Sequence, residues 1–206
     1  MQGYKTVEKM NVWEQVIEKS RFIGVIVPVN STEDGEQVLK NVRMDYPNAT
    51  HYVYAWRIQN GKLEKSSDDG EPQGTGGKPV LELLQHKELW NVILVVIRYF
   101  GGTLLGTGGL VRAYGGTARQ LVEQTEIKAL HPFIKLGIRL DYGMYEKVRY
   151  QLKQKKWSIG QEEFGQAIDL ETFVPEEEKG DFYQALDEWT GGKALIHSEQ
   201  VVLRAF

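Results

Sequence analysis

The chain has 206 residues, of which 41% are hydrophobic and 26% are charged, the composition of a globular protein with a core. It contains no cysteine, which excludes disulfides, thiolate metal ligands and cysteine nucleophiles, and which fits a reducing compartment. The net charge of −3 excludes a general attraction to nucleic acid, so a polyanion must be bound by a local patch. No apolar run reaches the roughly 18 residues that span a bilayer, and the start lacks the apolar segment of a signal peptide. We therefore expect a cytoplasmic protein with no membrane contact.

The residue pattern in the first half of the chain predicts a β-sheet packed against helices. Alternating or β-branched segments predict strands over 20–29, 49–59 and 91–100, and apolar residues at helical spacing predict helices over 32–47, 77–88 and 108–127. The continuous apolar run in 91–100 predicts a central strand that is buried on both faces. Tyr52, Tyr54 and Trp56 alternate along one strand, so they share a face, which we expect to be core. We expect the helices to cover one side of the sheet.

The composition changes after "KALHPF" (128–133), where Pro132 cannot continue a helix. We therefore predict two domains, 1–132 and 133–206. The second domain reads as a strand (133–142), a helix (145–156), a hairpin turning near Gly165, a helix opened by Pro175 and closed by Gly191 and Gly192, and a last strand. This order, strand-helix-strand-strand-helix-strand, is typical of a ferredoxin-like domain. The fold class is α+β.

Two glycine-rich stretches, "DDGEPQGTGGKP" (68–79) and "RYFGGTLLGTGGLVRAYGG" (98–116), each lie between a predicted strand and a predicted helix. The first N–H groups of a helix have no intrahelical partner, and glycine allows an anion to approach them closely. We therefore predict an anion- or RNA-binding site between the two stretches. Its candidate residues are Arg98, Tyr99, Phe100, Gly101, Gly102, Gly106, Gly108, Gly109 and Arg112 from the second stretch, and Gly74, Gly76, Gly77 and Lys78 from the first.

Other interpretations of these stretches stay open. Glycine pairs also permit tight turns and close packing, which best explains Gly115 and Gly116 inside a helix. Tyr99 and Phe100 suit either base stacking or the core. The P-loop and dinucleotide fingerprints do not fit, because Gly77-Lys78 is followed by Pro79 and the glycines of "GTGGLV" have the wrong spacing.

An acidic loop, Asp68, Asp69 and Glu71, is the remaining chemical candidate. Together with His51 it could hold a divalent cation, but three acids in one loop favour a solvated turn or a lid on Arg98. The chain has neither the HExxH spacing of metalloproteases nor the G-x-S-x-G turn of serine hydrolases. We expect no metal and no cofactor, and no motif in the sequence requires an enzymatic activity.

The sequence "VVIRYFGGTLLGTGGLVRAYGG" (95–116) resembles the signature of the IMPACT/YigZ family. The segments "KSRFI" (19–23), "ATHYVYAWR" (49–57) and "SDDGEPQGTGGKPVL" (67–81) support the resemblance across the first domain. It implies a first domain with the fold of a small-subunit ribosomal protein's second domain, shared with elongation factor G domain IV. It implies that the ferredoxin-like second domain is that of the bacterial branch.

The resemblance also implies a role in the regulation of translation initiation, since the eukaryotic member inhibits the starvation response. The leading hypothesis is therefore a binding protein that contacts RNA, the ribosome or a ribosome-bound factor through the glycine-rich basic face. The alternatives are a metal-dependent hydrolase, because some relatives carry a proline-dipeptidase label, and a protein-interaction module without a small ligand. The sequence leaves the oligomeric state open.

Overall fold

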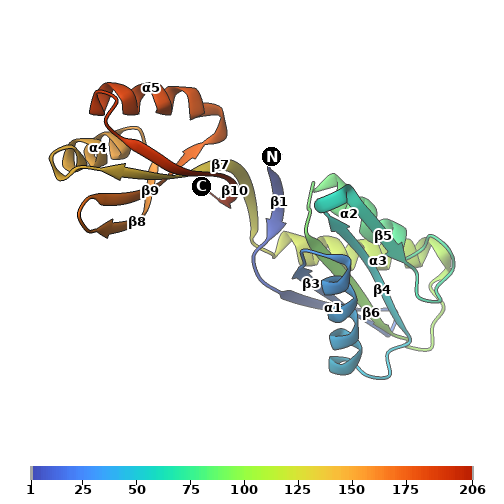
Figure 1. The fold of residues 1–206 in the computed structure, drawn as a ribbon. Helices are drawn as coiled ribbons and strands as arrows, with labels where there is room; N and C mark the ends of the chain where they lie inside the picture. The colour runs from blue at the N-terminus through green and yellow to red at the C-terminus, as the bar shows by residue number, and fades with distance from the viewer. Residues whose placement is uncertain (1, 206) are drawn as a thin grey trace. The chain divides into compact units, whose positions relative to one another are not determined.

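The computed structural model describes residues 2–205 and divides into two compact units (Figure 1). One unit comprises Tyr4–Lys128, and the other comprises Ala129–Phe206 with Met1–Gly3. It is a mixed α/β structure, as predicted, with two sheets. Within residues 2–205 no helix combines the length and the apolar character needed to cross a membrane.

The unit Tyr4–Lys128 is built on an antiparallel sheet with the strand order β2-β3-β6-β4-β5. Its elements are β1 (Tyr4–Val7), β2 (Asn11–Ile17), β3 (Ser20–Pro28), α1 (Thr32–Asp45), β4 (His51–Ile58), the short 3-10 helix η1 (Asn60–Lys62), β5 (Leu63–Ser67), α2 (Gly77–His86), β6 (Val92–Tyr99), α3 (Gly106–Glu123) and the start of β7 (Ile127–Leu140). The predicted central strand is confirmed, because β6 lies between β3 and β4 and Val92 to Ile97 are fully buried.

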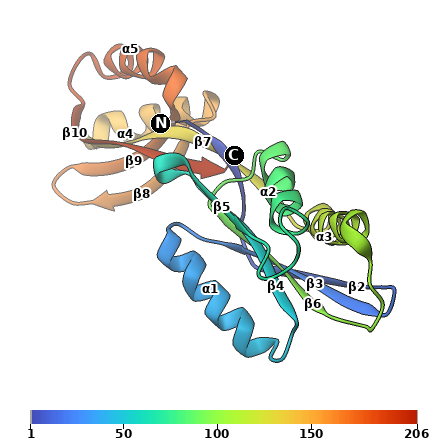
Figure 2. The same ribbon diagram turned by 90° about the vertical axis from the view of Figure 1, so that its right-hand side faces the viewer.

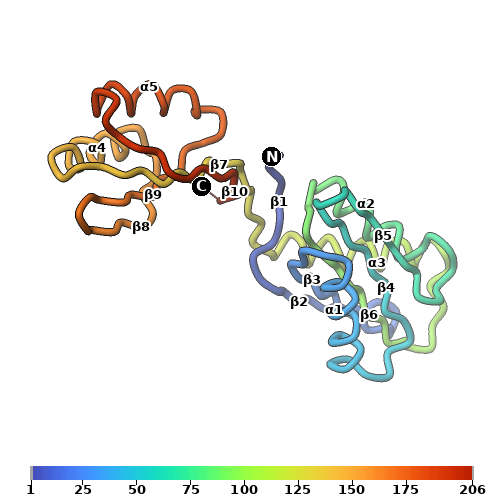
Figure 3. Tube along the Cα trace, viewed as in Figure 1, coloured from blue at the N-terminus to red at the C-terminus, as the bar shows by residue number. Residues whose placement is uncertain are grey.

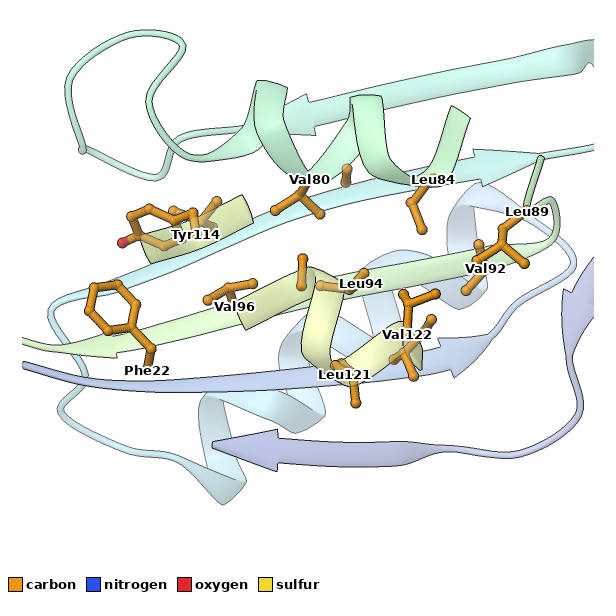
Figure 4. Close-up of a cluster of buried hydrophobic side chains, with 14 of the residues drawn as sticks. Phe22, Val80, Leu84, Leu89, Val92, Leu94, Val96, Tyr114, Leu121 and Val122 are labelled. Atoms are coloured by element: carbon orange, nitrogen blue, oxygen red, sulfur yellow. The ribbon is translucent and has the colours of Figure 1, made fainter. Parts of the chain in front are cut away.

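Helices cover both faces of this sheet, so the expectation of helices on one side was wrong. α2 and α3 pack on one face, where Val80, Leu84 and Tyr114 share a core with Phe22 of β3 and the rings of Tyr114 and Phe22 are in contact (Figure 4). α1 packs on the other face through Val42, and the two helical layers are seen on opposite sides of the strands in Figure 2. Tyr52, Tyr54 and Trp56 lie in this second core, as predicted. The alternation of a strand that is buried on both faces does not tell which face a helix covers.

Three strands of this unit, β1, β2 and β5, were not predicted. β2 carries Val12 and Val16 on an exposed face and Trp13 and Ile17 on the half-buried face, so its apolar residues do not alternate with polar ones. β5 is a short edge strand whose side chains are mostly polar and exposed. Neither of these two segments has the periodicity by which a strand is recognised in a sequence.

The second unit has the predicted element order. It contains most of β7, then α4 (Tyr142–Gln154), β8 (Ser158–Phe164), β9 (Ile168–Pro175), the 3-10 helix η2 (Glu176–Glu178), α5 (Lys179–Thr190) and β10 (Leu195–Ala205). β7 pairs with β9 and β10, and β8 pairs with β9, all antiparallel. α4 and α5 cover the same face of this sheet, since Val148, Leu152, Phe182 and Leu186 share one core. β7 starts earlier than predicted and runs through Pro132 without a break.

Candidate functional site

Both glycine-rich stretches lie at the same end of the first sheet. His51 at the start of β4 pairs with Arg98 near the end of β6, and Tyr54 of β4 pairs with Ser67 at the end of β5. The connection from β5 to α2 and the connection from β6 to α3 therefore leave the sheet at the same end of its strands. Both connections can be followed along the chain in Figure 3. The two stretches are therefore neighbours, and Arg98 of the second contacts Glu71 of the first.

The amides of the first stretch are occupied by an internal carboxylate. Asp68 accepts hydrogen bonds from the N–H groups of Gly74 at 2.8 Å, Gly76 at 2.9 Å and Gly77 at 2.8 Å. Burial raises the pKa of the Asp68 carboxyl, but the three amide bonds outweigh it and hold the pKa below its usual value. The assignment of Gly74, Gly76 and Gly77 to an external anion therefore needs correction, because their N–H groups already have an acceptor.

Lys78, the cation of this stretch, lies on the surface. Its side chain is 70% exposed, and its Nζ is 3.8 Å from a carboxylate oxygen of Glu82, one turn further along α2. Exposed pairs of this kind contribute at most about 0.5 kcal/mol. Lys78 is therefore free to exchange this partner for another anion.

Arg98 does not face solvent, and its prediction as a direct anion contact needs correction. The residue is 5% exposed, and its Nη1 donates to Glu71 Oε1 at 2.7 Å while its Nη2 donates to Ser20 Oγ at 3.3 Å. The hydroxyl of Tyr114 donates to the same Glu71 oxygen at 2.6 Å. A buried cation needs such partners, because an unpaired charge in the interior is costly. Glu71 thus covers Arg98 and joins the loop to β6 and α3.

Ser20 and Tyr114 complete this buried network, a role that no local pattern in the sequence indicates. Ser20 is fully buried, and its Oγ also accepts a hydrogen bond from the Gly101 N–H at 3.2 Å. Burial, followed by the hydrogen bond to Glu71, raises the pKa of the Tyr114 hydroxyl far above its ordinary value. The ring of Tyr114 lies in the core (Figure 4), while its hydroxyl bonds to Glu71.

The other acids of the loop are engaged separately. Asp69 accepts from the Tyr52 N–H at 2.7 Å and from Arg43 at 2.9 Å, and the Nδ1–H of His51 donates to the Asp69 carbonyl at 2.8 Å. The Nε2 of His51 is 3.7 Å from Glu71 Oε1. In the part of the chain that the structure describes, no group of three or more His, Asp or Glu side chains has an arrangement that could hold a metal ion.

The connection after β6 contains a glycine whose position explains its identity. A Cβ on Gly101 would lie 2.0 Å from the carbonyl carbon of Lys19, so the two backbones approach too closely for any side chain. Tyr99, before it, is half-buried and donates its hydroxyl to the Pro47 carbonyl at 3.2 Å. Phe100 is 45% exposed. Gly102 has φ of +86° and open space around it.

The second stretch keeps an open helix start. α3 begins at Gly106, which has φ of +67° and open space beside it. The N-cap residue of this helix is Leu105, whose apolar side chain makes no capping hydrogen bond. Gly108 is exposed, and a Cβ there would lie 3.6 Å from a guanidinium nitrogen of Arg112, so this side chain folds over the first turn. Gly109 packs against Leu105. The start of α3 therefore combines exposed residues, whose N–H groups have no intrahelical acceptor, with a nearby guanidinium.

Comparisons with known proteins agree with the resemblance in the sequence. Residues 18–122 match the Impact N-terminal domain, and residues 138–193 match a domain of unknown function, DUF1949. The chain is 34% identical over 203 residues to the IMPACT family member YvyE of Bacillus subtilis, covering 95% of this chain and 91% of that one. It is 35% identical over 109 residues to the Protein IMPACT homolog of Saccharomyces cerevisiae, covering 50% of this chain and 41% of that protein. A crystal structure described as a hypothetical protein superposes with a TM-score of 0.63 at 29% identity, covering 100% of this chain and 98% of that one.

Proposed function

The chain belongs to the IMPACT family, and on this premise we propose that it is a translation-associated regulatory protein that binds RNA, the ribosome or a ribosome-bound factor. The translational role comes from the family resemblance, in which the eukaryotic members regulate translation initiation. The binding role rests on the start of α3 and on the surface beside it.

One observation carries the binding proposal: the first turn of α3 is exposed, glycine-rich and uncapped, and Arg112 lies over it. Helix N-termini with free N–H groups attract phosphate, and a guanidinium adds a charge-assisted contact. Lys78 of α2 is a second exposed cation, and α2 and α3 pack side by side. The net charge of −3 is no obstacle, because phosphate contacts depend on the local patch.

Arg98 and the acidic loop hold the elements that carry this surface in place. The buried network of Arg98, Glu71 and Tyr114 joins the end of β6 to α3, which fixes the strand and the helix between which the glycine-rich connection runs. A preorganised surface binds more tightly because less ordering is required when the ligand arrives. The roles of these residues in the proposal are therefore positioning roles.

We also propose the finer fold names and the location. The strand and helix order of the second unit supports a ferredoxin-like domain, and the family supports an elongation factor G domain IV-like first domain. We also propose a domain boundary at 132/133; the second compact unit starts three residues earlier, at Ala129, and β7 crosses both positions without a break. A cytoplasmic location follows from the proposed translational role.

The proposal is tested by binding of short RNA to the wild-type chain and to a double variant, Lys78→Gln with Arg112→Gln. We expect the affinity to fall and the slope of log affinity against log salt to flatten by roughly 1.4, about 0.7 for each phosphate of a single strand that the variant no longer neutralises. The matched control is Lys40→Gln with Lys153→Gln, which removes two exposed cations from α1 and α4. Equal affinity and equal slopes for the wild type and the first double variant would contradict the proposed surface.

A further inference from the structure

Phe100 is an exposed aromatic residue held in a fixed position. Its backbone N–H donates to Thr50 Oγ1 at 3.1 Å, and the next N–H, of Gly101, donates to the buried Ser20. The Cζ atom of Arg98 lies 5.3 Å from the centroid of the Phe100 ring. Arg98 is itself held by Glu71 and Ser20, so the ring rests on an immobilised guanidinium while 45% of the residue faces solvent.

This ring belongs to the same face of the sheet as α2 and α3. Val92, Leu94 and Val96 of β6 pack in the core beneath these helices, and the alternation of the strand continues through Arg98, which contacts Phe22 of that core, to Phe100. Phe100 therefore lies on the face of the sheet that α3 covers, and the glycine-rich connection that follows Phe100 leads into the start of that helix.

A basic groove runs along the same two helices. It has a volume of about 380 Å³, and its lining includes Arg112 and Arg119 of α3 on either side of Gly115 and Gly116. Neither arginine has an ion-pair partner among residues 2–205. Seven residues of α-helix separate them along the axis by about 10.5 Å. The only acid that lines the groove in the described structure is Glu82, so its charge is complementary to a polyanion.

We propose that Phe100 is a stacking platform for one unpaired base, and that Arg112 and Arg119 guide the phosphates of the same strand along the groove between α2 and α3. This inference rests on the proposed function and specifies its ligand as single-stranded RNA. Stacking requires a free base face, which a duplex does not offer, whereas phosphate contacts alone would not distinguish the two forms. Phe100 therefore supplies preference for single strands, and the two arginines supply salt-dependent affinity.

The experiment measures binding of a labelled ten-nucleotide oligouridine and of an RNA duplex of equal length to the full chain. Phe100→Leu should weaken binding of the single strand by roughly 5- to 150-fold, the range for removal of one stacked base, and should leave duplex binding unchanged. Phe100→Trp should retain single-strand binding, because it keeps an aromatic face. Phe164→Leu is the matched control, since Phe164 is an exposed phenylalanine (59%) of the other unit. Arg119→Gln should flatten the salt dependence by about 0.7.

The outcomes separate this inference from the proposed function. Loss of binding in the Lys78→Gln, Arg112→Gln variant with no effect of Phe100→Leu would overturn the stacking platform and leave the phosphate surface standing. An equal loss of single-strand and duplex binding in Phe100→Leu would also overturn it, because it would show a general effect on the surface. Absence of binding of either RNA to the wild-type chain would overturn both.

Discussion

The two glycine-rich stretches have the same chemistry in sequence and different states in the structure. In the first, the Asp68 carboxylate accepts three amide hydrogen bonds at the start of α2. In the second, α3 starts at Gly106 with no capping side chain in the described part of the chain and with Arg112 beside it. Bare amides at a strand-to-helix junction therefore do not identify a ligand site by themselves. The presence or absence of a nearby internal carboxylate decides whether the amides are available.

The largest effect is expected at Glu71, which holds the first stretch to the rest of the unit. Glu71→Ala removes the partner of Arg98, and the side chains of the pair are 4% and 6% exposed. Because a buried guanidinium would be left without its counter-ion, we expect stability to fall by about 3–5 kcal/mol. Native-state hydrogen exchange of the β6 amides measures it, since it reports this unit separately.

A double variant tests whether the charge causes this destabilisation. In Glu71→Gln with Arg98→Met, no unpaired charge remains, so the destabilisation should be smaller than that of Glu71→Ala. If the double variant were less stable than Glu71→Ala, packing of Arg98 between Phe22 and Phe100 would be the dominant contribution instead.

A smaller effect is expected at Asp68. Asp68→Asn keeps the shape of the side chain but replaces an acceptor oxygen with an NH₂ group, so at least one of the glycine N–H groups is left without an acceptor. We expect stability to fall by about 1–3 kcal/mol, the range for hydrogen bonds to a charged group and for an unsatisfied donor. Urea unfolding at pH 7 measures this change, with Asp45→Asn as a control on the exposed end of α1.

The contribution of Asp68 should also depend on pH. Its pKa in the folded protein lies below that of an unfolded aspartate, about 3.9, so the folded form binds the proton more weakly. The stabilisation is therefore present above about pH 4 and is lost as the pH falls through the lower folded pKa. The difference in unfolding free energy between wild type and Asp68→Asn should be constant from pH 7 to pH 5 and should shrink in more acidic buffer. A difference that stayed constant down to pH 2 would contradict this account.

The smallest effect is expected when the second stretch is made to resemble the first. Thr107 is exposed in the first turn of α3, and Thr107→Asp would place a carboxylate near the free N–H groups. We expect stability to rise by about 0.3–1 kcal/mol through the helix dipole, and RNA affinity to fall because the carboxylate competes with phosphate. Thr107→Asn is the neutral control. A gain in stability with unchanged RNA binding would show that RNA does not use the start of α3.

Much of the fold could be predicted because its signals are local. The β-branched run that forms β6 and the glycines and prolines that bound the elements of the second unit mark their positions directly in the sequence. β2 and β5 were missed because their pairing with β3 and β4 determines their structure, rather than their own periodicity.

The sequence indicated that the two glycine-rich stretches are neighbours, but not the internal partners of their residues. An arginine at the end of an apolar strand gives the same sequence signal whether it faces solvent or the interior. What decides for Arg98 is a carboxylate 27 residues away and a hydroxyl 78 residues away, and no local pattern contains these distances. The same is true of Asp68, whose bonds to Gly74, Gly76 and Gly77 depend on the path of the loop.

The guanidinium of Arg98 touches an interior ring and a surface ring at once, since its Cζ lies 5.4 Å from the Phe22 centroid and 5.3 Å from the Phe100 centroid. Phe22 in turn meets Tyr114 edge to face, with centroids 5.3 Å apart. We expect a ligand that displaces the Phe100 ring to move the Arg98 guanidinium, and through it the environment of the buried Phe22 and Tyr114 rings. The proton resonances of Phe22 and Tyr114 become built-in reporters of occupancy, readable by NMR without any label on the ligand.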